Sequence, residues 1–201
     1  MIIEALLLGV AVGFMRGGSL KSLKSASIRM PVLLIVAFVI QMTMSFMMLA
    51  GSSFFLNSRM ILYAISYGLL FVALFFNLNS KAVWLLVFGS LLNFAVIFLN
   101  GGTLPIAAEA LERAGFTNRL ELIRSGRLVH YELSENVSGW MAFLGKRLSP
   151  PAYYPIKQVF SIGDAIISLG LFMWMHGLMQ GGGTYQRAQV IRVDHRRKSW
   201  R

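Results

Sequence analysis

Five apolar segments, separated by short polar stretches, limit what this chain can fold into more than any other feature of the sequence. They cover about residues 1–15, 31–50, 60–76, 82–99 and 158–179. About 20 apolar residues let a helix cross a hydrocarbon core about 30 Å thick, and the middle three segments come close to that length. The first segment lacks the basic start and the polar cleavage region of a signal peptide, so we interpret it as a retained short span. The sequence therefore predicts an all-α fold, a polytopic membrane helix bundle with five transmembrane helices.

The amino-acid composition also indicates a membrane protein. Hydrophobic residues make up 56% of the chain and charged residues only 13%, whereas about a quarter of a soluble domain is charged. The net charge of +11 lies mainly in short loops and in the C-terminal tail, where anionic lipid head groups and membrane topology account for it better than nucleic acid does. We therefore predict membrane lipids, and no nucleic acid, as partners. The absence of cysteine excludes disulfides, thiolate nucleophiles and thiolate metal sites.

The basic residues also predict which side of the membrane each part of the chain faces. Residues 16–29 carry four basic residues and no acid, and the tail 181–201 carries six basic residues against one acid. Basic residues in short loops and tails collect on the cytoplasmic side. We therefore expect the first loop and the tail in the cytoplasm, facing anionic head groups, and the N-terminus outside. The domain prediction is a membrane domain over residues 1–180, followed by a basic cytoplasmic tail.

Residues 101–157, between the fourth and fifth apolar segments, contain no stretch long enough to cross a membrane, and this topology puts them on the outer face. Pro105 suits the first turn of a helix, where its missing N–H would be unpaired anyway, and Gly115 suits the end of that helix. Asn118 and Glu121 resemble a capping box that opens a second helix. The sequence therefore predicts an outer segment of short helices.

Polar side chains within the fourth and fifth segments predict how these two segments pack. Ser161, Asp164 and Ser168 are three and four residues apart and share one helix face, and Asn93 and Asn100 share a face of the fourth segment. Because an unpaired polar group in hydrocarbon costs several kcal/mol, both faces should turn inward. Small residues that allow close helix approach repeat along the same segments: Gly89, Gly163, Gly170 and Gly177. Further side chains that can extend this polar lining are Gln41, Ser45, Tyr63, Ser66 and Tyr67.

Two roles are open for these polar residues. Amides and hydroxyls such as those of Asn93 can simply bridge helices. Asp164 can be a first-turn residue stabilised by the helix dipole and free backbone N–H groups, or it can be a ligand or proton site. His130 is the only histidine of the outer segment, and a lone histidine is a weak metal signal. No metal and no cofactor is predicted, because the sequence contains no phosphate loop and no metalloprotease or hydrolase motif.

Several motifs together resemble a bacterial multi-pass membrane family of unknown function. They are Leu92-Asn93-Phe94, Asn100-Gly101-Gly102 with Leu104-Pro105, Glu109-Ala110-Leu111, His130, and Phe160-Ser161-Ile162-Gly163-Asp164. The resemblance extends from the first apolar segment to about Met179. It implies a multi-pass protein of the bacterial cytoplasmic membrane, and it implies no substrate. The chain departs from the family pattern after Leu144-Gly145, where an acid is expected and Lys146 stands.

A candidate polar site follows from these motifs at the outer ends of the fourth and fifth segments. Its residues are Asn93, Asn100, Gly101, Gly102, Pro105, His130, Ser161, Gly163 and Asp164. We expect Gly101 and Gly102 to turn the chain sharply, and Asn100 to cap this turn or to hydrogen-bond toward Asp164. The first functional hypothesis is a non-enzymatic accessory or structural membrane component. The alternatives are a transporter of small solutes or lipids, and a membrane-embedded enzyme for a lipid-linked substrate with Asp164 and His130 as acid and base. A homo-oligomer or a membrane complex is also expected.

Overall fold

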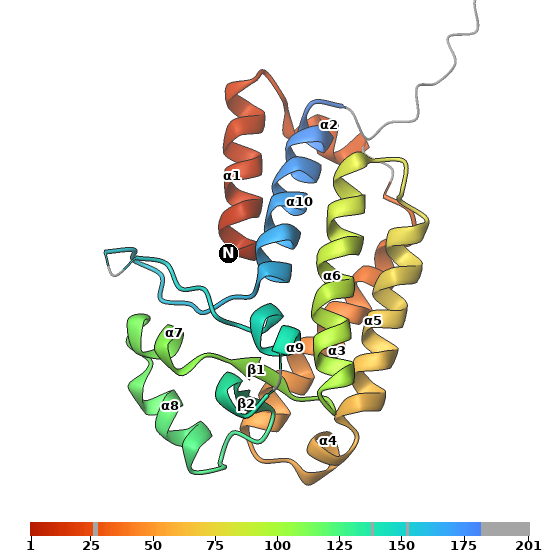
Figure 1. Cartoon of the computed structure of the whole chain (residues 1–201). Coiled ribbons are helices and arrows are strands. Elements are labelled where there is room, and N and C mark those ends of the chain that lie inside the picture. Colours follow the sequence, from red (N-terminus) through yellow and green to blue (C-terminus); the bar gives the residue numbers. More distant parts are fainter. Residues whose placement is uncertain (26–27, 138, 152, 182–201) are drawn as a thin grey trace, which may run out of the picture.

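The computed structural model describes residues 1–25, 28–137, 139–151 and 153–181, and the basic tail beyond Gly181 lies outside them. Five apolar helices and two short connecting helices form the main body (Figure 1). The apolar helices are α1 (Ile2–Met15), α3 (Pro31–Leu49), α5 (Arg59–Phe75), α6 (Lys81–Leu99) and α10 (Ile162–Met179). The connecting helices are α2 (Leu20–Ser25) and α4 (Ser53–Asn57). The prediction of a mostly helical fold is confirmed.

Three of these helices are long and apolar enough to cross a membrane: α3, α6 and α10, with 19, 19 and 18 residues. The other two, α1 and α5, are equally apolar in character but span only 14 and 17 residues. The five apolar segments of the sequence thus become five helices, three of which reach the length of a full span.

The helix α10 packs against both α6 and α1, and small residues bring these helices close together. A Cβ atom at Gly170 would lie 2.8 Å from a methyl group of Leu86 in α6, and one at Gly9 would lie 2.9 Å from the Cβ of Met175 in α10. On the other side α5 packs against α3 and α6. Helix α6 therefore stands between the pair α1–α10 and the pair α3–α5.

The lower end of α10 in Figure 1 does not reach the lower end of α6. The first turn of α10 packs beside Asn93, and six residues of α6 follow before its end at Leu99. At 1.5 Å per residue this difference is about 9 Å. The lower halves of α3, α5 and α6 are therefore left uncovered by α1 and α10, and the segment 101–157 lies beside them instead (Figure 1).

This segment contains two short parallel strands as well as helices. Strand β1 (Leu104–Ile106) pairs with β2 (Tyr131–Leu133), and Lys146 adds a further parallel bridge on Ile106. The remaining elements are α7 (Ala108–Arg113), α8 (Thr117–Arg124), the 3₁₀ turn η1 (Ser134–Asn136) and α9 (Gly139–Leu144). Buried apolar side chains give the segment its own small core: Ile106, Ala108, Leu111, Leu120, Ile123 and Leu128.

Two local predictions in this segment are wrong. Pro105 does not open a helix; it lies in β1, and its carbonyl oxygen accepts a hydrogen bond from the Lys146 backbone N–H at 2.8 Å. The fixed φ of proline suits either conformation, and here the pairing of β1 with distant chain selects the extended one. Asn118 does not cap α8 either, because α8 begins at Thr117 without a side-chain cap. Gly115 does follow the end of α7, with φ at +73°.

Candidate functional site

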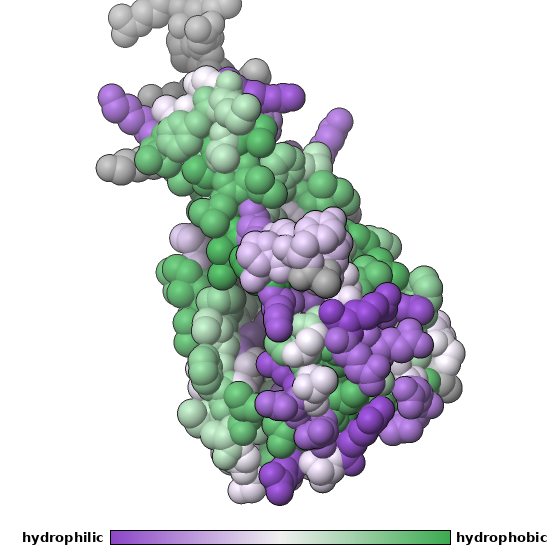
Figure 2. All heavy atoms as spheres, turned by 90° about the vertical axis from the view of Figure 1, so that its left-hand side faces the viewer, coloured by the Kyte–Doolittle hydropathy of each residue, from purple (hydrophilic) through white to green (hydrophobic). Residues whose placement is uncertain are grey.

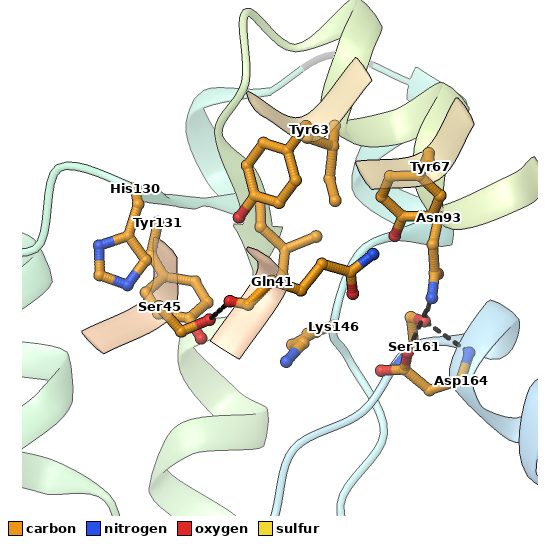
Figure 3. A pocket seen from close by; sticks show the side chains of 12 residues that line it. Gln41, Ser45, Tyr63, Tyr67, Asn93, His130, Tyr131, Lys146, Ser161 and Asp164 are labelled. Carbon is orange, nitrogen blue, oxygen red and sulfur yellow. Dashed lines mark hydrogen bonds between the residues drawn. The ribbon is translucent and has the colours of Figure 1, made fainter. Parts of the chain in front are cut away.

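A polar cavity of about 170 Å³ lies where α3, α5, α6 and the start of α10 meet the outer segment. Nearly all of its lining residues are polar: Gln41, Ser45, Tyr63, Tyr67, Asn93, Ile97, Leu104, His130, Tyr131, Lys146, Ser161 and Asp164. In Figure 3, His130 and Tyr131 lie at one end, Asn93, Ser161 and Asp164 at the other, and Gln41 and Lys146 between them. The cavity therefore draws on seven separate parts of the chain.

One end of the cavity is a closed hydrogen-bond network around the first turn of α10. The Ser161 hydroxyl accepts from the Asp164 N–H at 2.9 Å, and the Asp164 carboxylate accepts from the Ser161 N–H at 3.0 Å, which together form a capping box. The Asn93 amide donates to the second oxygen of Asp164 at 2.7 Å and accepts from the Ser161 hydroxyl at 2.8 Å. The first-turn role predicted for Asp164 is thus confirmed. Both of its carboxylate oxygens are engaged.

Close approach of α6 and α10 makes this network possible. A Cβ atom at Gly163 would overlap the side chain of Asn93, and one at Gly89 would lie 2.7 Å from the Gly163 carbonyl oxygen. The glycine at each position therefore lets the Asn93 amide reach the start of α10. Gly163 thus serves the site by its lack of a side chain.

The other half of the sequence-predicted site forms a separate cluster below the cavity. Asn100 donates to the Thr103 hydroxyl at 2.7 Å and to the Glu132 carboxylate at 3.1 Å. Gly101 and Gly102 turn the chain with φ of +62° and +80°, as the sequence predicts. Of the two roles predicted for Asn100, the structure shows the one within the turn, where its amide donates to Thr103. It does not bond to Asp164, because α10 begins about two turns deeper than α6 ends and its first turn meets Asn93 instead.

His130 lies at the cavity and is buried, with 8% of its surface exposed. Its carbonyl oxygen accepts from the Leu104 N–H at 3.0 Å, which fixes the residue at the start of β2. Within the described residues no hydrogen bond reaches its Nδ1 atom. Burial lowers the pKa of the imidazole, and the positive charges of Arg119 and Lys146 lower it further. The side chain is therefore neutral at pH 7.

Lys146 is a cavity residue that sequence reasoning did not include in the site. Backbone bonds hold it beside β1: its N–H donates to the Pro105 oxygen, and its own oxygen accepts from the Ala107 N–H at 2.9 Å. The preceding Gly145 allows this, because a Cβ there would lie 2.6 Å from the Pro105 oxygen. The only sequence feature that drew attention to Lys146 was its departure from the family pattern, and that departure does not predict the pairing of Lys146 with β1.

The polar side chains of the cavity centre have no partner among the residues that the structure describes. The Lys146 ammonium lies 5.9 Å from the centre of the Tyr131 ring, but it makes no hydrogen bond or ion pair within the described part of the chain. The same holds, among the described residues, for the hydroxyls of Tyr63 and Tyr67 and for the side-chain amide of Gln41. Buried polar groups are normally hydrogen-bonded to protein or to another molecule. The centre of the cavity is therefore suited to holding a polar guest.

The positions of Asp164 and His130 do not favour acid–base catalysis by this pair. A general acid and a general base must each reach the reacting atoms at hydrogen-bond distance. Asp164 is held by the capping box and by Asn93, and His130 lies at the opposite end of the view in Figure 3. In the residues that the structure describes, no group of three or more His, Cys, Asp or Glu side chains could hold a metal ion.

The comparisons with known proteins give one match. Residues 25–176 match the profile of a protein family described as "Family of unknown function (DUF5317)". This range includes α3, α5, α6, the whole outer segment and most of α10. No curated protein and no solved structure matches the chain.

Proposed function

The chain belongs to the DUF5317 family, a family of unknown function, and from this premise we propose that it is an integral membrane protein that binds a small polar ligand in the cavity without transforming it. The observation that carries this proposal is a set of polar groups at the cavity centre that have no partner among the described residues: Gln41, Tyr63, Tyr67 and Lys146. The proposal keeps the non-enzymatic role of the first sequence-based hypothesis. It differs in giving the protein a solute or lipid to bind rather than a purely structural role.

Membrane residence is supported by three apolar helices of sufficient length and by the surface they present. Large apolar side chains are exposed along α3, of which Phe38 and Phe46 are about 60% exposed. Figure 2 shows apolar residues over the upper part and one flank of the molecule, while hydrophilic residues gather over its lower part. Lipid chains covering the apolar flank would account for this division.

The proposed topology has five spans over residues 1–180, with the N-terminus and the segment 101–157 outside and the tail 181–201 in the cytoplasm. The basic residues of the first loop and the tail then face anionic lipids of the bacterial cytoplasmic membrane. The helices α1 and α5 are short for this role, and their charged or polar ends would have to lie close to the head groups. A homo-oligomer or a membrane complex stays a prediction.

The depth of the cavity supports a binding role. The cavity side chain Asn93 lies about two turns inside the end of α6, and Gln41 and Tyr67 lie near the middle of their own apolar helices. Unsatisfied polar groups at such depth cost free energy, and irregular chain at this depth is tolerated when it lines a cavity. A ligand that pairs with these groups would recover that cost.

Thermal unfolding of the purified full chain in detergent tests the proposal. We would titrate small solutes of positive, negative and zero charge and follow intrinsic tryptophan fluorescence. At least one class should raise the Tm of the wild type, since binding to the folded state alone stabilises it. The double variant Gln41→Leu, Tyr67→Phe should lose this shift, and Tyr153→Phe, at a fully exposed tyrosine, should keep it. The proposal fails if no class shifts the Tm, or if the cavity variant responds as the wild type does.

A further inference from the structure

We propose that the cavity is an oxyanion site in which the Lys146 ammonium holds a phosphate or carboxylate group of the ligand. This inference rests on the proposed binding function and names the chemical class of the ligand. It is carried by the hydrogen-bonding inventory of the cavity, by the position of Lys146 and by the burial of His130.

The side chains at the cavity centre offer more hydrogen-bond donors than acceptors, although the Gln41 carbonyl and the tyrosine oxygens can also accept. Lys146 can offer three N–H groups, the hydroxyls of Tyr63 and Tyr67 one each, and the Gln41 amide two. The carboxylate of Asp164, by contrast, already accepts from Asn93 and from the Ser161 N–H. A ligand that satisfies this inventory must mainly accept hydrogen bonds, and an oxyanion is the group that accepts most of them.

Lys146 supplies a positive charge that no described residue neutralises. Its side chain is half-buried, and no carboxylate of the described residues lies within 4.0 Å of the ammonium, although Asp164 lines the same cavity. A partly desolvated cation without a counter-ion is costly, and a paired one forms strong charge-assisted hydrogen bonds. The backbone bonds to Pro105 and Ala107 keep the residue beside the cavity whether or not a ligand is present.

His130 adds a buried, neutral side chain to the lining of the same cavity. It is more than nine-tenths buried, it lines the cavity, and its Nδ1 atom has no partner among the described residues. A neutral imidazole can donate one hydrogen bond to an oxyanion without bringing a charge of its own. In Figure 3 it lies with Tyr131 at one end of the cavity, and Lys146 lies between it and Asp164.

The size and opening of the cavity fit a small anionic group. A volume of about 170 Å³ is many times the roughly 10–15 Å³ that a cavity needs to hold one water molecule. In Figure 2 the surface is hollowed between the apolar flank and the hydrophilic segment. Such an opening would admit either a free anion or the phosphate of a lipid head group, so the shared oxyanion is the inference and the test must separate the two sources.

The first arm of the test titrates inorganic phosphate and acetate against the full chain in detergent, at constant ionic strength, with Tm as the readout. Lys146→Gln should weaken the apparent affinity about tenfold or more, because charged hydrogen bonds are the strong ones. Lys157→Gln removes an exposed lysine of the same outer segment and should bind as the wild type does. Lys146→Arg, which keeps the charge, should retain most of the affinity.

The second arm compares nanodiscs of phosphatidylglycerol with nanodiscs of phosphatidylcholine. A Tm increase specific to phosphatidylglycerol and lost in Lys146→Gln would identify a lipid phosphate as the source, and a response to inorganic phosphate would identify a soluble anion. Either result supports the oxyanion site.

A folding control keeps the test decisive. Without ligand, Lys146→Gln should be at least as stable as the wild type, because it removes a partly buried charge without a partner. If that variant binds anions as the wild type does, or if neither anions nor phosphatidylglycerol shift the Tm, the oxyanion site is ruled out. A shift by cations or neutral solutes that depends on Gln41 and Tyr67 would overturn this inference alone and leave the proposed binding function standing.

Discussion

At the scale of single residues, Asp164 shows how a conspicuous acid can be committed to structure. Its carboxylate caps α10 and binds Asn93 of α6, so one side chain both starts a helix and fastens it to its neighbour. The sequence allowed this role, because Ser161 and Asp164 have the spacing of a capping box. Lys146, which lines the same cavity, was not predictable, because its position depends on a β-bridge between residues 40 apart in the chain.

His130 provides a residue-scale prediction about pH. Its pKa in the folded protein is lowered from the model-peptide value of 6.5 by burial and by nearby positive charge. Between the two pKa values the unfolded chain binds more protons than the folded one. The stability contributed by the neutral imidazole is therefore fully present above pH 6.5 and is lost as the pH falls below it.

The measurement compares the wild type with His130→Gln in phosphate-free buffer, with thermal unfolding followed from about pH 7.5 down to about pH 5.5. The wild type should lose more stability than the variant over this range, since only the wild type must keep an imidazole unprotonated in order to stay folded. Parallel pH profiles of the two proteins would contradict the assignment.

At the scale of elements, apolar length predicts the five main helices to within a few residues, because hydrophobic runs of this kind have few other structures open to them. The strands β1 and β2 were not predicted. Each has only three residues, and they pair across 27 positions of sequence, so their conformation depends on tertiary contact rather than on local pattern. Pro105 was assigned to a helix for the same reason.

The glycines of α10 give a prediction at this scale. Gly163→Ala should lower the free energy of unfolding by about 1–3 kcal/mol, since overpacking a tight contact costs roughly that much and the new Cβ would overlap Asn93. Gly177→Ala is the matched control on the same helix, because nothing lies within 4 Å of a Cβ there. It should be neutral or slightly stabilising, as alanine favours a helix over glycine. Equal effects at both positions would mean that α6 and α10 do not approach as closely as the structure has them.

At the scale of the whole molecule, the sequence did not predict where the end of α6 lies relative to the start of α10. The motifs that end α6 and begin α10 were expected to meet at one surface, since each borders an apolar segment. In the structure they lie about two helical turns apart, and the outer segment packs beside the part of α6 that α10 does not cover. The length of an apolar segment predicts the length of its helix. The position of that helix along the axis of its neighbour depends on how the two pack.

The proposed topology gives a whole-molecule prediction that the lack of native cysteine makes simple to test. Ser125→Cys lies on the exposed end of the outer segment and Lys21→Cys on the exposed face of α2. A membrane-impermeant maleimide should label the first variant in intact cells and the second only after permeabilisation, because the basic first loop is expected inside. The reverse pattern would invert the orientation, and labelling of both in intact cells would contradict the alternation of the spans.

The bond between Asn93 and the start of α10 also bears on how the protein is made. Its amide binds Ser161 and Asp164, which follow 68 and 71 positions later in the chain. At a synthesis rate of about 5–20 residues per second, α6 waits several seconds for α10 to emerge. In the proposed topology, a nascent chain in the bilayer would carry an amide with neither of its final partners during that interval. If the helices cross a membrane as proposed, α6 would need shelter, from the insertion machinery or from neighbouring helices, until α10 arrives.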